Sequence, residues 1–334
     1  MKENKRNVLV TGGAGFIGSH VAGELILMGY RVIVIDDLSG GFLDNVPKGA
    51  KFVRGSINDF ALLSRLFKLY KFDYVFHLAA YAAEGLSHFI KRFNYTNNVI
   101  GSVNLINESV KNNVKCFVFT SSIAVYGENQ TPFKEGLTPK PENSYGIAKF
   151  AVELELKACQ KMFGLNYIIF RLHNVYGENQ NIGDKYRNVI GIFLNNIMKN
   201  IPLVIFGDGK QTRAFSYISD VAPLIARSIK KPVCYGQTFN VGTDKPYTID
   251  YLAQVVIQAM SVKGKIVHVE ARNEVKHAYS SHAKIRKIFG SQQSVGLEEG
   301  VARMAQWVQR VGVRKNKDFK AIEIHKNLPS VWKK

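Results

Sequence analysis

Short apolar runs alternate along the first half of the chain with segments whose apolar residues recur at helical spacing. The runs predict strands at residues 7–11, 31–36, 51–54, 74–77, 116–120 and 167–171. The two longest segments with helical spacing are 87–113 and 144–163. Strands that alternate with helices form a parallel sheet whose two faces are both covered. The pattern therefore predicts an α/β fold built on a doubly wound parallel sheet.

The rhythm changes after residue 174, where a loop rich in Asn, Gly and Asp begins. The elements predicted beyond it are a helix near 188–199, strands at 203–206 and 237–241, and a helix capped by Ser219 and Asp220. No repeat or low-complexity linker divides the chain. We therefore expect a second, smaller region that is interwoven with the first.

A glycine-rich turn joins the first predicted strand to the helix that follows it. Gly13, Gly15 and Gly18 fit the spacing G-x-G-x-x-G, whose glycines form a tight turn, admit a pyrophosphate and let the helix pack on the sheet. The phosphates would lie at the N-terminus of that helix. Asp36 ends the next strand, where its carboxylate can accept hydrogen bonds from ribose hydroxyls and repel a 2′-phosphate. The sequence therefore predicts a site for NAD rather than NADP.

Length and composition exclude several classes of protein. With 334 residues, 46% of them hydrophobic, the chain can bury a large core in one or two domains. No apolar run approaches the roughly 20 residues that cross a bilayer, so we expect a cytoplasmic protein without a membrane partner. Cys116, Cys159 and Cys234 are scattered, with no C-x-x-C pair for zinc or redox chemistry. We expect no metal site and reduced, structural cysteines.

The net charge of +19 raises the question of a nucleic-acid partner. The lysines are dispersed singly among acidic residues, and the densest basic cluster lies in the tail from Arg310 to Lys334. The chain carries no helix-turn-helix, zinc-finger or RNP pattern. We therefore expect no nucleic-acid binding, and a basic surface that attracts an anionic substrate.

Three residues form a candidate catalytic group. Ser122 follows the predicted strand 116–120, and Tyr145 and Lys149 lie one turn apart on one face of the helix 144–163. An ammonium beside the tyrosine, together with a positive nicotinamide ring, would lower the tyrosine pKa and make a phenolate available as a base. Ser122 can hydrogen-bond the same substrate oxygen. The alternative is that Tyr145 packs in the core while Lys149 points to solvent.

Taken together, the motifs resemble those of one family. They are Thr11-Gly12-Gly13-Ala14-Gly15-Phe16-Ile17-Gly18, His77-Leu78-Ala79-Ala80, Asn97-Asn98-Val99, Ser121-Ser122, Tyr145 with Lys149, Asn174-Val175-Tyr176-Gly177, and Gly207-Asp208-Gly209 before Gln211-Thr212-Arg213. Over residues 6–313 the chain resembles an extended short-chain dehydrogenase/reductase, in the branch of NAD-dependent nucleotide-sugar epimerases and dehydratases.

The resemblance implies the roles of further residues. Tyr145 would be the base, Lys149 would also hold the nicotinamide ribose, and Ser122 would shuttle the proton. The implied NAD site comprises Gly12, Gly15, Phe16, Ile17, Gly18, Asp36, Asp37, Ser56, Ile57, Leu78, Ala79, Ala80, Asn98, Tyr145 and Lys149. The implied substrate site comprises Ser122, Asn174, Arg213 and Arg272 around the phosphates and sugar, Phe206 against the base and Ala278 beside the sugar. Surface ion pairs for the two arginines and a core position for Phe206 are the alternatives.

The resemblance also implies a domain division and an oligomer. Residues 1–173 and 214–242 would bind NAD, residues 174–213 and 243–314 would bind a nucleotide sugar such as a UDP-sugar, and residues 315–334 would form a basic extension at the surface. A homodimer would form through the two long helices 87–113 and 144–163.

One pair of residues favours a particular reaction. Related 4,6-dehydratases carry an Asp-Glu pair after the catalytic Ser or Thr, whereas this chain has Ile123-Ala124, which cannot transfer a proton. The sequence therefore favours a 4-epimerase acting on UDP-hexoses through a transient 4-keto sugar, with NAD recycled. A reductase or dehydratase of the same family and a non-catalytic NAD-binding regulator are the alternatives.

Three departures from the family pattern affect the substrate. Arg213 is followed by Ala214 in place of the usual Asp, and Glu84 stands in a segment where related epimerases often carry a Lys or Arg. A carboxylate at Glu84 would repel a uronate sugar. Ala278 would leave room for an N-acetyl group, whereas an alignment shifted by one residue would put Tyr279 there and exclude it.

Overall fold

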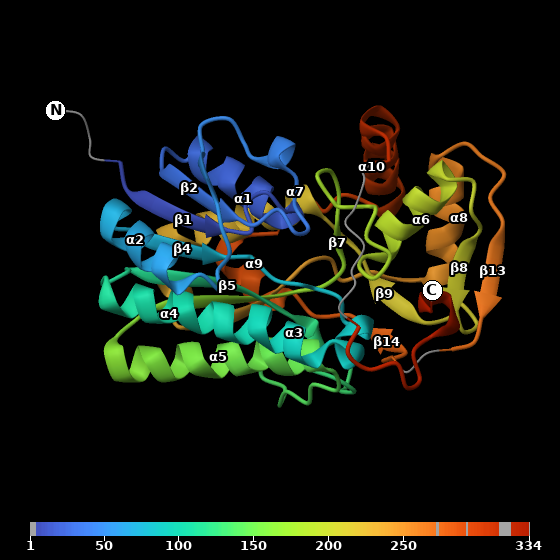
Figure 1. Ribbon diagram of the computed structural model, residues 1–334. Coiled ribbons are helices and arrows are strands. Elements are labelled where there is room, and N and C mark those ends of the chain that lie inside the picture. Colours follow the sequence, from blue (N-terminus) through green and yellow to red (C-terminus); the bar gives the residue numbers. More distant parts are fainter. Residues whose placement is uncertain (1–4, 272–273, 292, 314–321, 334) are drawn as a thin grey trace.

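A seven-stranded parallel sheet forms the centre of the computed structural model, which describes residues 5–271, 274–291, 293–313 and 322–333 (Figure 1). Its strands are β1 (Asn7–Thr11), β2 (Arg31–Asp36), β3 (Lys51–Arg54), β4 (Tyr74–His77), β5 (Cys116–Ser122), β6 (Tyr167–Leu172) and β11 (Gln237–Val241). The order β11-β6-β5-β4-β1-β2-β3 reverses direction between β1 and β4. This order confirms the predicted doubly wound parallel sheet.

Helices cover both faces of the sheet. Those on one face are α1 (Phe16–Leu27), α7 (Ile218–Arg227) and α9 (Ala283–Phe289), and those on the other are α2 (Phe60–Tyr70), α4 (Gly101–Lys111) and α5 (Ser144–Phe163). Successive strand residues point to opposite faces, so Val8 and Val10 join the first core while Leu9 joins the second. Burial on both faces explains why these strands read as continuous apolar runs.

The segment 87–113 is not one helix, which corrects the prediction. It is divided into the 3₁₀ turn Gly85–Phe89, α3 (Lys91–Tyr95), the π-helical turn Thr96–Ile100 and α4. Within the π-turn, Asn98 accepts the Tyr81 N–H at 2.9 Å and donates to the Tyr81 carbonyl at 3.1 Å. This long-range tie fixes the turn, and apolar periodicity carries no sign of it.

A smaller lobe is built from segments of the second half. It contains α6 (Val189–Met198), β8 (Leu203–Phe206), β9 (Thr212–Ala214), β12 (Pro246–Thr248), α8 (Ile249–Ala259), β13 (Ile266–Val269), β14 (His277–Ala278) and α10 (Leu297–Val311). The pair β7 (Val175–Tyr176) and β10 (Ser216–Tyr217) lies where the chain passes between the lobes. Remaining 3₁₀ turns are Leu43–Asn45, Ile123–Val125, Ser228–Lys230, Pro232–Cys234 and Ser330–Trp332.

One smaller expectation is also corrected. Helix α7 begins at Ile218 without a side-chain cap, because the Asp220 carboxylate accepts the Val295 N–H at 2.9 Å instead. Residues 322–333 lie at the surface, and most of them are exposed, but the apolar side chains of Leu328 and Trp332 are buried against the protein. Within the described part of the chain, no helix has the length and apolar character to cross a bilayer.

Candidate active site

A cavity of about 520 Å³ runs along the carboxyl ends of the central strands and continues beneath the smaller lobe. Ligands bind in this position in open α/β sheets, where the strand order reverses. Glycines of the turn after β1 line one end, Ser122 and Tyr145 line the middle, and Phe206 lines the other end. We refer to this cavity as the cleft.

The glycine turn has little room for side chains. Gly12 adopts a left-handed φ of +70°, and a Cβ there would lie 2.8 Å from the Ala79 backbone. A Cβ on Gly18 would lie 2.1 Å from the Gly12 carbonyl oxygen, and one on Gly15 3.0 Å from the same atom. Gly12 therefore forms the tight turn, and Gly13 does not. A Cβ on Gly13 would instead meet the Val34 side chain on the neighbouring strand.

The cradle fits a dinucleotide. The Asp36 carboxylate accepts the Ala14 N–H at 3.1 Å and the Leu38 N–H at 2.8 Å, which holds it at the rim of the turn. Burial raises the pKa of Asp36, and these two hydrogen bonds oppose the rise. Lining the cleft are the predicted cofactor residues Gly12, Gly15, Phe16, Ile17, Gly18, Asp36, Asp37, Ser56, Ile57, Leu78, Ala79 and Ala80. Asn98 does not line it, because its amide is used to hold Tyr81, and the neighbouring Asn97 lines it instead.

Asp36→Ala is expected to reduce the preference for NAD over NADP by roughly tenfold or more, because it removes the charge that opposes the 2′-phosphate. Calorimetric titration of both cofactors measures the preference. The exposed Asp44, which lies outside the cleft, supplies the control Asp44→Ala. Equal affinities of the wild type for NAD and NADP would contradict the assignment of Asp36.

The catalytic candidates converge where β5 ends and α5 begins. The Asn143 side chain accepts the Gly146 N–H at 2.8 Å and so caps α5, one residue before its first turn presents Tyr145 to the cleft. Ser122 lines the same part of the cleft. Lys149 is buried below, with its Nζ donating to the Thr120 carbonyl at 2.8 Å and 5.8 Å from the centre of the Tyr145 ring. The alternative in which Lys149 points to solvent is wrong.

The electrostatics of Tyr145 differ from the expectation. Burial raises the pKa of Tyr145, the Glu84 carboxylate raises it further, and a hydrogen bond with Ser122 lowers it. Burial also lowers the pKa of Lys149 to about 7. The protein's own groups therefore raise the tyrosine pKa, and a positively charged nicotinamide beside the ring would act in the opposite direction.

A buried ion pair fastens the catalytic helix to the sheet. Arg171 on β6 donates from Nε and Nη2 to the two carboxylate oxygens of Glu153 on α5, at 3.0 and 2.6 Å. Ser121 donates to the same carboxylate at 2.6 Å. Burial alone would lower the pKa of Arg171, but the hydrogen bonds and charge of Glu153 raise it. The sequence did not identify this pair: Arg171 is the one charged residue in an apolar strand, but Glu153 is one of five charged residues in the helix segment 144–163.

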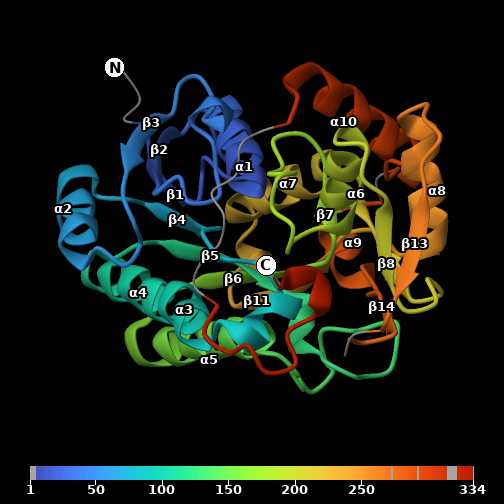
Figure 2. The same ribbon diagram turned by 45° about the vertical axis from the view of Figure 1, so that its right-hand side comes forward.

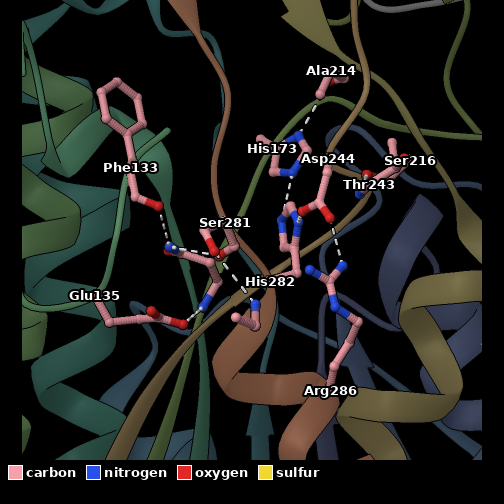
Figure 3. Close-up of polar contacts among 12 residues, drawn as sticks. Phe133, Glu135, His173, Ala214, Ser216, Thr243, Asp244, Ser281, His282 and Arg286 are labelled. Carbon is pink, nitrogen blue, oxygen red and sulfur yellow. Dashed lines mark hydrogen bonds and ion pairs between the residues drawn. The ribbon is translucent and has the colours of Figure 1, made fainter. Parts of the chain in front are cut away.

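A second network joins His173, which precedes Asn174 in the chain, to His282 and Asp244 (Figure 3). His173 Nδ1 donates to the Ala214 carbonyl at 3.1 Å, and its Nε2 faces Nε2 of His282 at 3.0 Å. His282 Nδ1 lies 2.6 Å from the Asp244 carboxylate, which Arg286 also contacts at 2.6 Å. Each imidazole already uses one N–H, so the facing nitrogens need one additional proton between them. Burial lowers the pKa of His173 to about 3, and the charge of the neighbouring His282 lowers it further.

The substrate candidates gather at the smaller lobe. Asn174, Phe206, Arg213 and Ala278 all line the cleft, and Tyr279 does not. The Arg213 guanidinium donates to the carbonyls of Val275 and Lys276 at 2.6 and 3.0 Å, and strand register places Ala278 opposite it. Arg272 lies outside the described residues.

Glu84 enters the cleft from the opposite side. Its carboxylate accepts the Asn143 amide at 2.9 Å. No group of three or more His, Cys, Asp or Glu side chains that could hold a metal ion occurs in the described ranges. All three cysteines of the chain are buried and free. The cleft is thus equipped for proton transfer and for a dinucleotide.

A family model described as "NAD dependent epimerase/dehydratase family" matches residues 8–242. The chain belongs to this family. A relative from Methanocaldococcus jannaschii named putative UDP-glucose 4-epimerase is 34% identical, over 90% of this chain and 98% of the relative. A UDP-N-acetyl-alpha-D-glucosaminuronate decarboxylase from Bacillus cytotoxicus is 30% identical, over 92% of this chain and 99% of the relative. A UDP-glucose 4-epimerase from Thermotoga maritima, solved with UDP-glucose, has a TM-score of 0.87 and 35% identity, with 91% of this chain and 99% of that chain covered.

Membership of the NAD-dependent epimerase/dehydratase family confirms three predictions. These are the family itself, the use of NAD and the class of enzyme, an NAD-dependent epimerase. The relatives are named for more than one reaction on nucleotide sugars. The substrate and the reaction of this chain must therefore be argued from its own residues.

Proposed function

We propose that the protein is a UDP-hexose 4-epimerase that acts through a transient 4-keto sugar. The observation that carries the proposal is that Ser122 and Tyr145 line one cleft with the glycine turn, while Lys149 is buried directly below Tyr145. The residues that follow Ser122 are Ile123 and Ala124, which have no group able to remove water from the sugar. These side chains therefore support a redox reaction in which no water is eliminated from the sugar.

Each side chain has a distinct part in the reaction. Tyr145 accepts the proton of the C4 hydroxyl, and Ser122, hydrogen-bonded to Tyr145, holds the same oxygen as it becomes a carbonyl. Lys149 lies below the tyrosine, with its Nζ 5.8 Å from the ring centre, where its protonated form would stabilise a phenolate. NAD, when bound at the glycine turn, would supply the acceptor for the hydride of the sugar C4 and the donor of the same hydride to the ketone. Because the hydride returns to the sugar, we expect no net reduction of added NAD during turnover.

The end of the cleft lined by Phe206 and Arg213, which we call the nucleotide end, has side chains that suit a nucleoside diphosphate. The Arg213 guanidinium has a planar fork that matches diphosphate oxygens. It now contacts three carbonyls and, at 3.5 Å, the Glu274 carboxylate, contacts that such a ligand would replace in part. Phe206 offers an aromatic ring to the base at the end of the cleft. Glu84 faces the sugar end, which favours a neutral hexose over a uronate.

Purified protein is expected to interconvert UDP-GlcNAc and UDP-GalNAc as well as UDP-glucose and UDP-galactose. Ala278 borders the cleft with a small side chain, so an N-acetyl group has room. Ala278→Tyr should remove the N-acetyl activity selectively and leave the UDP-glucose activity. New anomeric signals in NMR spectra, with UDP-glucuronate and GDP-mannose as further substrates, measure both. Rejection of both N-acetyl sugars by a wild type that converts UDP-glucose would contradict this view of the pocket.

We further propose a homodimer formed by α4 and α5. The large apolar side chains exposed on or beside these helices are Ile100, Ile147, Leu154, Met162 and Phe163. A second copy related by a twofold axis would bury them in a four-helix interface.

Sedimentation at micromolar concentration is expected to give a dimer for the wild type and a monomer for Leu154→Glu, because a charge in an apolar interface is costly. Leu69, which is also exposed but lies on α2, supplies the control Leu69→Glu. A wild-type monomer, or dissociation by both substitutions alike, would argue against this interface.

A further inference from the structure

The last described residues of the chain pack beside the nucleotide end of the cleft, although none of them lines the cavity. In Figures 1 and 2 the red C-terminal segment lies between α3 and β14. Its side chains Ile322, Leu328 and Trp332 form an apolar cluster with the segment after β4, which includes Leu86 and Phe89. The segment is therefore packed against the protein on the side where Phe206 lines the cleft.

One end of this segment is anchored through α3. The N-cap residue of α3, Ile90, has no side chain able to cap the helix. The Glu323 carboxylate instead accepts the N–H groups of Arg92 and Phe93, both at 2.8 Å. Its own N–H donates to the Phe89 carbonyl at 2.8 Å. Glu323 thus caps a helix more than two hundred residues away, which fixes the segment in place.

The other end is anchored by Trp332, which is 8% exposed. Its ring lies 6.2 Å from Phe89, 5.3 Å from Tyr186 and 6.4 Å from Phe206, all measured between ring centres. Phe89 belongs to the larger lobe, whereas Tyr186 and Phe206 line the cleft from the other side. Trp332 therefore packs against two side chains that line the cleft, one of which is the ring expected to contact the nucleotide base.

We propose that residues 322–333 form a strap over the nucleotide end of the cleft, and that Trp332 is a nucleotide-binding residue that covers the base beside Phe206. The inference rests on the proposed function. The Trp332 ring meets Phe206 edge to face, with the ring centres 6.4 Å apart. A small rotation of the Trp332 ring would therefore present an aromatic surface to a planar base.

The chain has two tryptophans, which makes the strap measurable. Trp307 is buried in the core of the smaller lobe, so in Trp307→Phe the emission reports on Trp332 alone. Titration of that variant with UDP is expected to quench the emission. In an otherwise wild-type chain, Trp332→Ala should weaken UDP binding about tenfold by calorimetry, and raise KM for UDP-glucose similarly with kcat little changed. Trp332→Phe, which keeps an aromatic face, should retain most of the affinity.

A second variant and a control separate the strap from general damage. Glu323→Ala removes the other anchor and should weaken UDP binding in the same direction, and in the Trp307→Phe background it should shift the emission to the red before UDP is added. Val331→Ala, on the exposed side of the same turn, should behave as the wild type. UDP binding by Trp332→Ala that equals or exceeds the wild-type affinity would overturn the strap while leaving the proposed function intact. A wild type that binds no UDP would overturn the proposed function itself.

Discussion

Tyr145→Phe is expected to lower the turnover of UDP-glucose by about a thousandfold while NAD stays bound. Tyr145 lies in the first turn of α5 and its ring is buried, so a phenylalanine ring would pack in the same way. The oxygen that accepts the C4 proton would be lost. Steady-state kinetics measure the turnover, and calorimetry or copurified cofactor measures NAD binding.

A tyrosine outside the cleft provides the matched control. Tyr251 on α8 is exposed, so Tyr251→Phe removes a hydroxyl from the same kind of side chain without touching the cleft. Its turnover should equal that of the wild type. Near-normal turnover in Tyr145→Phe would rule out the tyrosine as the base.

Glu153→Ala is expected to lower the free energy of unfolding by about 3–5 kcal/mol. The substitution would leave the Arg171 guanidinium buried without its partner and the Ser121 hydroxyl without its acceptor. Both side chains of the ion pair are almost completely buried, so water cannot replace the lost contacts. Chemical denaturation at neutral pH measures the loss.

Glu155 supplies the comparison, since it lies two residues further along α5 on the exposed side. Glu155→Ala should change the free energy of unfolding by less than about 0.5 kcal/mol. The difference between the two variants isolates burial and pairing from the loss of a charge on the helix. Similar small effects in both would show that the Glu153–Arg171 pair contributes little to stability.

Local patterns determined much of the fold and of the site. The strands at 7–11, 31–36, 51–54 and 74–77 occur as predicted, because a strand buried on both faces needs an unbroken apolar run. The glycine turn and Asp36 were predictable because a dinucleotide cradle is formed by neighbouring elements of one β-α-β unit. Tyr145 and Lys149 were predictable as a pair because one helical turn places them on one face.

The sequence by itself therefore determined the sheet and the use of NAD, and it predicted Ser122, Tyr145 and Lys149 as the catalytic group, because each of these depends on spacing within a short stretch. Tertiary structure alone decided the break in 87–113, the Glu153–Arg171 pair, the His173–His282 contact and the docking of Trp332. These features join residues that are distant along the chain, and no local period reports which side chains will meet. Burial then sets their energies, because a charge or an aromatic ring acquires its role from the partners that exclude water around it.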